Sequence, residues 1–172
     1  MDTPLLDVAG LHLRYRDAAD DALRGVSLTQ RAGECVALVG ASGAGKTTLC
    51  RCLCRVIPTF HRGDLRGRIR LAGESIAGMA VHALVPRLGV VFQDFESQLF
   101  STNVLQEVAF GLENLGLPRA EMAARIDDAL ARVGLTGLAD REPATLSGGQ
   151  KQRLAIAAVL AMAPALLIMD EP

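Results

Sequence analysis

The sequence predicts an α/β fold built around a mostly parallel β-sheet. Three short apolar runs support this prediction, at residues 35–39, 89–92 and 166–169. Runs without polar alternation are typical of strands in a parallel sheet, because helices cover both faces of such a sheet. A chain of 172 residues, 50% of them hydrophobic, is long enough for one domain with a core and short for two.

Residues 5–29 precede the first of these runs and are expected to form short strands. Leu13 and Tyr15 alternate with polar neighbours, and the alternation resumes at Val26 after an Asp-rich turn. Another short strand is expected at residues 68–71. Alternation of this kind is typical of strands with one buried face and one solvated face.

Segment 40–48 reads Gly-Ala-Ser-Gly-Ala-Gly-Lys-Thr-Thr and lies between an expected strand and a helix-compatible stretch, 46–56. It matches the phosphate-loop pattern G-x-x-x-x-G-K-[ST] in the setting that the pattern requires. Its glycines let backbone N–H groups surround phosphate oxygens, and the following helix directs its positive end at the same anion. Lys46 is expected to reach the β- and γ-phosphates, and the Thr47 hydroxyl to ligate Mg²⁺. A Gly-rich turn without a ligand would not need this Lys-Thr pair.

Two helices are expected at residues 102–117 and 119–133. In the second, Glu121 is placed to pair with Arg125, and Gly134 is typical of a helix end. Four apolar side chains of that helix share one face: Met122, Ile126, Leu130 and Val133.

A second Gly-rich corner, Leu-Ser-Gly-Gly-Gln at 146–150, precedes an expected helix at 151–162. Ser147 and Gln150 have the spacing of a capping box, so this corner could simply start the helix. However, each of the two glycines in the first turn costs about 1 kcal/mol relative to alanine. An anion that approaches the bare backbone explains both glycines, so we expect the corner to bind phosphate.

The apolar run 166–169 ends in Asp170 and Glu171. Two carboxylates at the end of a buried strand fit a site for Mg²⁺ and a nucleotide. Because strand side chains alternate, the two are expected to point in different directions. One of them can serve the Mg²⁺ coordination sphere while the other faces the attacking water.

The cysteines do not indicate a metal site. Cys50, Cys52 and Cys54 alternate along the expected helix after the phosphate loop, and Cys35 lies in the first apolar run. This is not the spacing of zinc ligands, and no histidine completes a set. We therefore expect packed thiols in a reducing compartment.

Charge and hydropathy exclude further classes. The net charge of −1 disfavours a general polyanion binder. A concentration of arginines between residues 51 and 70 is interpreted mainly as a solvated face, with contact to nucleic acid or lipid headgroups as the alternative. No signal peptide is recognised, and the longest apolar run, 154–169, is shorter than a bilayer span. We therefore expect a chain that does not cross a membrane.

Together these motifs resemble an ABC-type ATPase domain over essentially the whole chain. The matching motifs are the phosphate loop, Gln93 as the Q-loop glutamine, the signature at 146–150 and the strand at 166–171. Within that family, residues 91–100 and 108–118 are similar to the ATPases of energy-coupling factor (ECF) importers, which power uptake of vitamins or of cobalt and nickel ions. One departure is Asp-Phe after Gln93, where the family usually has Asn-Pro.

The resemblance implies a P-loop NTPase fold with a mostly parallel core sheet, an N-terminal antiparallel β subdomain and an inserted helical subdomain. Residues 1–172 would form one ABC ATPase domain. Residues 1–100 and 151–172 would form the nucleotide-binding core with its β subdomain, and residues 101–150 the helical signature subdomain.

The resemblance also implies roles for individual residues. Glu171 would polarise the hydrolytic water, Gln93 would sense the γ-phosphate, and Lys46 would complete the catalytic set. Mg²⁺ would be held by Thr47, Gln93 and Asp170. The residues implied to contact ATP are Tyr15, by stacking on adenine, and Gly40, Ser42, Gly43, Ala44, Gly45, Lys46, Thr47, Thr48, Ser147, Gly148, Gly149 and Gln150.

The implied partners are proteins. A second ABC ATPase domain, identical or related, would form a head-to-tail dimer in which the signature corner caps the γ-phosphate of the neighbour's ATP. Residues 98–100 would lie near the surface that grips coupling helices of an integral membrane component, which works with a substrate-binding membrane subunit. The implied location is the cytoplasmic face of the membrane, and no nucleic-acid partner is expected.

The sequence stops at Pro172, whereas the family continues with a D-loop, a switch histidine and further core strands. His12, His61 and His82 all precede the signature, so none of them is that histidine. We therefore expect a truncated piece of a longer protein. The C-terminal part of its fold would be missing, and the piece alone would show little ATPase activity.

Two other functions compete with the importer ATPase. One is a soluble ABC ATPase that acts on nucleic acid or the ribosome, for which the chain lacks the long coiled coils of SMC-like proteins. The other is an inactive fragment that only binds ATP. The region at 98–100 favours transport.

Overall fold

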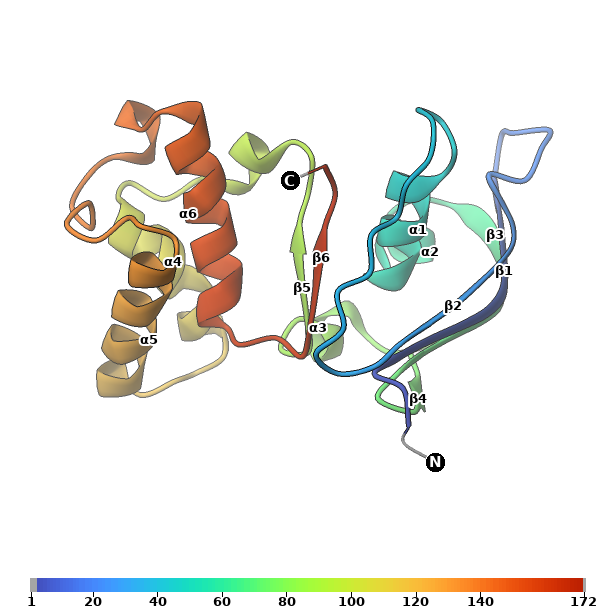
Figure 1. Cartoon of the computed structure of the whole chain (residues 1–172), viewed down its shortest axis with the longest axis horizontal. Helices are drawn as coiled ribbons and strands as arrows, with labels where there is room; N and C mark the ends of the chain where they lie inside the picture. The colour runs from blue at the N-terminus through green and yellow to red at the C-terminus, as the bar shows by residue number, and fades with distance from the viewer. Residues whose placement is uncertain (1–2, 172) are drawn as a thin grey trace. The chain divides into compact units, whose positions relative to one another are not determined.

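The computed structural model describes residues 3–171 and divides into two compact units, 1–85 and 86–172. Each unit is treated separately below (Figure 1). None of the described helices is both long enough and apolar enough to span a bilayer.

The first unit contains an antiparallel sheet in the order β2-β1-β3-β4. Its strands are β1 (Leu6–Tyr15), β2 (Leu23–Gln30), β3 (Gly63–Leu71) and β4 (Glu74–Ser75). The expected strands within 5–29 are confirmed as the β1–β2 hairpin. The strand expected at 68–71 is also present, but β3 begins earlier, at Gly63, because its first half pairs with the end of β1.

A β-bulge keeps the apolar side of β1 facing inward along its whole length. Val8 and Leu11 are both buried although two residues lie between them, which would put them on opposite faces of a regular strand, and the register shifts between them. Gly10 lies within this shift and has φ of +55°. The extra residue of the bulge therefore turns Leu11 and Leu13 back towards the core.

Helices of the first unit cover one face of this curved sheet (Figure 1). They are α1 (Lys46–Leu53), α2 (Val56–Thr59) and α3 (Val81–Leu84). The helix expected at 46–56 is confirmed to Leu53, and it ends there because Arg55 has a left-handed backbone with φ of +59°.

The second unit packs three helices against each other beside a two-stranded parallel sheet. The strands are β5 (Leu88–Val91) and β6 (Leu166–Met169), and the helices are α4 (Val104–Asn114), α5 (Arg119–Arg132) and α6 (Gly148–Ala161). Two short 3₁₀ helices, η1 (Phe95–Gln98) and η2 (Pro143–Thr145), lie in the connections. The expected helices and both expected strands are confirmed, with ends shifted by a few residues.

The core of the second unit is aliphatic and forms between the three helices. Leu112 on α4, Leu130 on α5 and Leu154 on α6 are all almost fully buried within it. Gly111 allows close packing, since a Cβ at this position would lie 2.6 Å from the sulfur of Met162. The α6 residues thus pack with α4 and α5, the helices of the expected signature subdomain.

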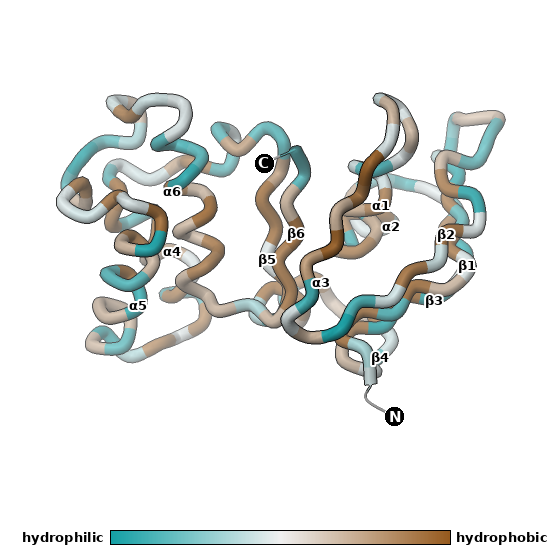
Figure 2. Tube along the Cα trace, viewed as in Figure 1, coloured by the Kyte–Doolittle hydropathy of each residue, from teal (hydrophilic) through white to brown (hydrophobic). Residues whose placement is uncertain are grey.

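The prediction of a strand at residues 35–39 is wrong for this structure. The segment carries no strand, and Val36, Leu38 and Val39 are exposed, Val39 by 93% (Figure 2). A strand requires a hydrogen-bonded neighbour, and none of the described strands pairs with this segment. The mostly parallel sheet is therefore represented by the β5–β6 pair alone among the described residues.

Candidate functional site

The phosphate loop of the first unit closes around its own lysine. The Lys46 ammonium group donates hydrogen bonds to the carbonyl oxygens of Gly40, at 2.9 Å, and of Ala41, at 3.1 Å. Helix α1 begins at this lysine, directly after the loop. The positive side chain and the positive helix end therefore lie at the same loop, where an anionic ligand gains from both.

Two glycines of the loop have backbones that other residues rarely adopt. Gly43 has φ of +78° and Gly45 has φ of +93°. A Cβ at Gly45 would also lie 2.9 Å from the carbonyl oxygen of Ala22, so space as well as conformation requires glycine. Among the described residues, no acceptor is found for the amides of Gly43 and Gly45. Such amides are suited to phosphate oxygens.

The structure places the remaining predicted residues of the first unit beside this loop. The Tyr15 hydroxyl lies 3.1 Å from the Thr48 hydroxyl, so the end of β1 meets the first turn of α1. Thr47 precedes Thr48 in that turn and is half-buried. Ser42 and Ala44 lie in the exposed turn of the loop. The stacking of Tyr15 on adenine stays a prediction.

In the second unit, the ends of β5 and β6 bring two predicted residues together. Val91 lies opposite Met169 in the parallel register, and the amide of Asp170 donates to the carbonyl of Val91 at 2.9 Å. Directly beyond, the side-chain amide of Gln93 donates to the Glu171 carboxylate at 2.6 Å. The predicted γ-phosphate sensor and the predicted catalytic carboxylate are therefore in direct contact.

Asp170 and Glu171 differ in their surroundings. Asp170 is only 5% exposed, whereas Glu171 is exposed. Burial continues to alternate from β6 through Asp170 and Glu171, as expected for strand side chains, although β6 itself ends at Met169 and Glu171 has a left-handed backbone with φ of +57°. The two carboxylates thus have different surroundings, as the sequence led us to expect, and their separate roles stay predictions.

The signature corner both caps α6 and leaves its first turn open. The Ser147 hydroxyl accepts from the Gln150 amide at 3.3 Å, and the Gln150 side chain accepts from the Ser147 amide at 2.9 Å. The capping box is therefore real. Nevertheless, a Cβ at Gly148 or Gly149 would meet nothing within 4 Å. Packing therefore does not require these glycines, and phosphate binding at this corner stays a prediction.

Sequence reasoning missed the contacts that hold the segment after Gln93. The Gln98 side chain accepts from the amide of Phe92 at 2.9 Å and donates to the carbonyl of Val90 at 3.3 Å, which ties η1 to β5. Lys151, next to the signature, pairs with Glu96 at 3.2 Å. Only the three-dimensional fold reveals these pairs, because their members are far apart in the sequence or separated by a turn.

The donor atoms that would hold Mg²⁺ are of the right chemical type. Thr47 offers a hydroxyl oxygen, Gln93 an amide oxygen and Asp170 a carboxylate oxygen, and Mg²⁺ prefers oxygen ligands while keeping several waters. No cluster of three or more His, Cys, Asp and Glu residues able to hold a metal alone is found among the described residues. Thr47 belongs to the first unit, and Gln93 and Asp170 belong to the second, so their joint coordination of Mg²⁺ stays a prediction.

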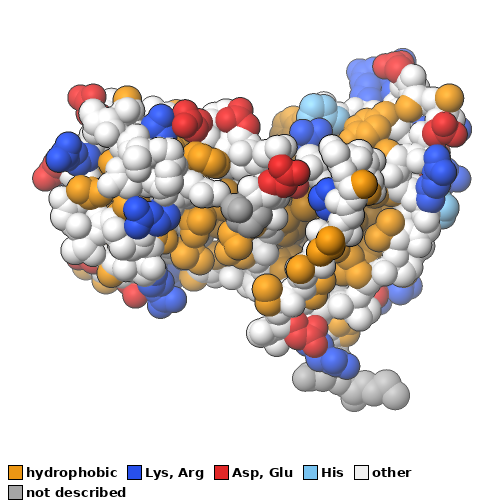
Figure 3. Space-filling view, turned by 45° about the horizontal axis from the view of Figure 1, so that its top comes forward, with side chains coloured by type: hydrophobic (Ala, Val, Ile, Leu, Met, Phe, Trp, Pro, Cys, Tyr) orange, Lys and Arg blue, Asp and Glu red, His pale blue; other side chains and the backbone are white. Residues whose placement is uncertain are grey.

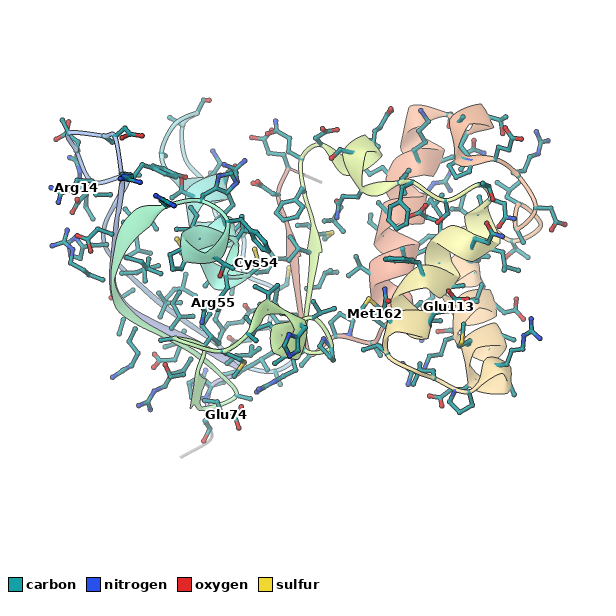
Figure 4. All side chains as sticks on the ribbon, turned by 180° about the vertical axis from the view of Figure 1, so that it is seen from behind. Arg14, Cys54, Arg55, Glu74, Glu113 and Met162 are labelled. Carbon is teal, nitrogen blue, oxygen red and sulfur yellow. The ribbon has the colours of Figure 1, made fainter. Side chains whose placement is uncertain are left out.

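The cysteines of α1 are packing residues, as expected. Cys50, Cys52 and Cys54 are buried, and Cys54 lies next to Arg55 at the end of this helix (Figure 4). Burial raises the pKa of the Cys52 thiol to about 12 and also raises the pKa of Cys54. The Cys52 thiol therefore stays protonated at neutral pH, which disfavours the reactive thiolate. Cys35 is exposed.

Comparison with known sequences identifies related proteins. A family model described as ABC transporter matches residues 23–172. The energy-coupling factor transporter ATP-binding protein EcfA1 of Lacticaseibacillus paracasei is 42% identical over 97% of this chain and 58% of its own length. EcfA1 of Geobacillus kaustophilus is 41% identical over 99% of this chain and 60% of its own length.

Solved structures agree with the sequence relatives. CbiO1 of Clostridium perfringens, described as part of the ABC transporter complex cbiONQ, has a TM-score of 0.87 and 38% identity, and it is matched over 66% of its chain. A bacterial Atm1-family ABC exporter with ATP bound has a TM-score of 0.79 and 34% identity, with 29% of its chain matched. The chain spans between 25% and 60% of the length of the curated relatives it matches.

Proposed function

This chain belongs to the ABC transporter family, and on that premise we propose that it binds and hydrolyses ATP to drive an importer of the energy-coupling factor type. Its fold is the α/β fold of P-loop ABC ATPases, with antiparallel N-terminal strands and a helical insert. The observation that carries the proposal is the phosphate loop closed around Lys46 at the start of α1.

ATP binding begins with the phosphate loop. Its open amides and the Lys46 ammonium take the place that water holds around the β- and γ-phosphates in solution. Thr47 and Asp170 would hold Mg²⁺, which supplies charge neutralisation on the phosphate oxygens. Tyr15 is placed beside Thr48 and would cover the adenine ring with its aromatic face.

Hydrolysis then requires a carboxylate that orients water. The exposed carboxylate of Glu171 would polarise the attacking water, and Gln93, which touches it, would respond to the γ-phosphate. The contact between these two side chains supports joint action, since a change at one alters the hydrogen bonding of the other.

A second ATPase domain completes the proposed site. The first turn of α6 presents Gly148 and Gly149 without side chains, which leaves the backbone amides open to a phosphate on a neighbouring domain. An ATP molecule clamped between two positive helix ends would join two domains head to tail, and its hydrolysis would remove the bridge. The neighbour is an identical or a related chain.

The proposed membrane partner would dock on aromatic side chains after η1. Phe100 is 62% exposed and Phe110 is 46% exposed, and their rings meet edge to face with centroids 4.6 Å apart. Exposed paired aromatics are typical of protein interfaces. We propose that they receive coupling helices of an integral membrane component at the cytoplasmic face of the membrane. A separate membrane subunit would choose the substrate, a vitamin or a transition-metal ion.

The distribution of charge disfavours the nucleic-acid alternative. Arg66 and Arg68 on β3 pair with Asp21, at 3.0 Å, and with Asp7, at 3.2 Å. Charges of both signs are interspersed on the face seen in Figure 3. A phosphate backbone requires a continuous positive surface, and these two arginines are instead paired with neighbouring carboxylates.

The test of hydrolysis uses Glu171→Gln in the full-length protein. The amide cannot polarise water as a carboxylate does, so phosphate release should fall by a factor of about 100 or more, while Mg-ATP binding persists. Phosphate release and ATP-dependent dimerisation are measured on the same samples, with Glu113→Gln, an exposed carboxylate on α4, as the control. Normal phosphate release by Glu171→Gln would remove Glu171 from the proposed role.

A further inference from the structure

A buried carboxylate on α4 holds the turn that carries Phe100. Glu107 is only 4% exposed, and one of its oxygens accepts hydrogen bonds from two successive amides, those of Phe100 at 3.0 Å and Ser101 at 2.7 Å. Val104 and Val108 on the same helix are fully buried. A charged side chain therefore occupies a position in an apolar row of α4.

Packing alone does not explain this carboxylate. Burial of a charged group is costly unless hydrogen bonds replace its water, and a leucine would fill the same space without that cost. The two amide hydrogen bonds, together with the position of Glu107 in the first turn of α4, supply the compensation. Beyond packing, the carboxylate fixes the backbone at Phe100 and Ser101 by accepting hydrogen bonds from both amides.

The same helix also holds the ring of Phe100. Phe110 lies on α4 one turn after Glu107, and its ring meets that of Phe100 at 85°. Helix α4 thus fixes Phe100 twice, through its backbone and through its ring. Gln93, which precedes Phe100 in the connection between β5 and α4, donates a hydrogen bond to Glu171.

We propose that Glu107 is a positioning residue that holds the Phe100 turn in one geometry, so that a membrane partner docked on Phe100 and Phe110 can act on the ATPase. The inference rests on the proposed function, since it assumes docking at these aromatics. Glu107 touches neither nucleotide nor water in this role. Its loss should therefore weaken the coupling between partner and ATPase and leave nucleotide binding unchanged.

The first measurement is amide hydrogen exchange over residues 99–102 in the full-length protein. In Glu107→Leu, which keeps the apolar packing but removes the acceptor, exchange at Phe100 and Ser101 should accelerate by about 10-fold to 100-fold. Glu107→Gln keeps an acceptor oxygen and should largely restore protection. Glu113→Leu removes an exposed carboxylate of the same helix (Figure 4) and should change nothing. Wild-type exchange at Phe100 and Ser101 in Glu107→Leu would overturn the inference.

The second measurement is ATP hydrolysis by the full-length protein, with and without its transmembrane subunit in lipid nanodiscs. For Glu107→Leu we expect basal turnover and the KM for ATP to stay within about twofold of wild type, while stimulation by the subunit falls by about tenfold. Glu107→Gln should recover the stimulation, which a general loss of stability would not show. Full stimulation in Glu107→Leu would overturn the positioning role.

The two measurements separate this inference from the proposed function. If wild-type protein hydrolyses no ATP, the proposed function fails, whereas the exchange experiment still decides whether Glu107 holds the turn. If Glu107→Leu does not fold, Glu107→Met, an unbranched side chain that also lacks the acceptor oxygen, decides instead. Exchange at Phe100 and Ser101 should again accelerate by about 10-fold to 100-fold, and wild-type exchange in that variant would overturn the inference.

Discussion

The three cysteines at α1 are buried, whereas Cys35 is exposed. Burial raises the pKa of Cys52 to about 12, so its thiol stays protonated well above neutral pH. The thiolate is the form that reacts. The sequence predicted packing for these thiols from their spacing, but it placed Cys35 in a buried strand, and the structure exposes it.

We expect a disulfide reagent to label one of the four thiols of the native chain rapidly, at about pH 8, and the other three only after unfolding. Cys35→Ser should remove the rapid phase, and rapid labelling of all four native thiols would contradict the assigned burial.

The raised pKa of Cys52 also makes the stability depend on pH. In the unfolded chain this thiol loses its proton near the ordinary thiol pKa of about 8.5, whereas in the folded chain it keeps the proton up to about pH 12. Unfolding between these two pH values therefore releases a proton, so the free energy of unfolding should fall as the pH rises above about 8.5.

The residues of the predicted site could be named from the sequence, but their contacts could not. The phosphate loop, Gln93, the signature and the carboxylate pair each stand out by local pattern. The hydrogen bond between Gln93 and Glu171 depends on the register of β5 with β6, which no local pattern records. Glu107 offered one signal, a charge in an apolar row of α4, which the sequence analysis did not use.

At the scale of elements, helices were easier to predict than the first strand. Helix α5 carries its own periodicity and its own Glu121–Arg125 pair, observed at 2.8 Å, and Gly134 ends it with φ of +69°. A strand instead depends on a neighbour that the sequence does not show. Residues 35–39 have the composition of a buried strand, yet no described strand pairs with them.

The start of α6 gives a prediction that separates folding from binding. In Gly149→Ala the new Cβ meets nothing within 4 Å, and alanine favours a helix by about 1 kcal/mol, so the free energy of unfolding should stay the same or rise. ATP-dependent pairing of the full-length protein should nevertheless weaken, because the methyl group covers the backbone offered to the neighbour's phosphate. Chemical denaturation and light scattering with Mg-ATP measure the two effects.

Gly89→Ala is the matched comparison for Gly149→Ala. Its Cβ would collide with Val159 and would lie 2.9 Å from Pro164, so unfolding should become easier by about 1–3 kcal/mol. If Gly149→Ala destabilised the fold as Gly89→Ala does, its glycine would have a packing role. That result would contradict the proposal that the glycines of the signature corner leave room for a phosphate from a neighbouring domain.

At the scale of the whole molecule, the functional motifs are divided between the two compact units. The phosphate loop and Tyr15 belong to the first unit, and the signature corner and the Gln93–Glu171 pair belong to the second. The proposed function requires both units to serve the same ATP-driven cycle. The α/β fold class and the family were predictable from the motifs, because these motifs are local and specific. The arrangement of strands depends on pairings between distant segments and was predicted only in part.

The most direct test of the central claim is a calorimetric titration of Mg-ATP into the full-length protein and its Lys46→Ala variant. Lys46 supplies the only side-chain ammonium of the loop, so its removal should weaken ATP binding by about 10-fold to 100-fold or more while the fold is retained. Arg51→Ala, which removes a cation from the last turn of the same helix, should bind ATP within about twofold of wild type. Equal affinity of wild type and Lys46→Ala for Mg-ATP would contradict the assignment of this loop as the nucleotide site.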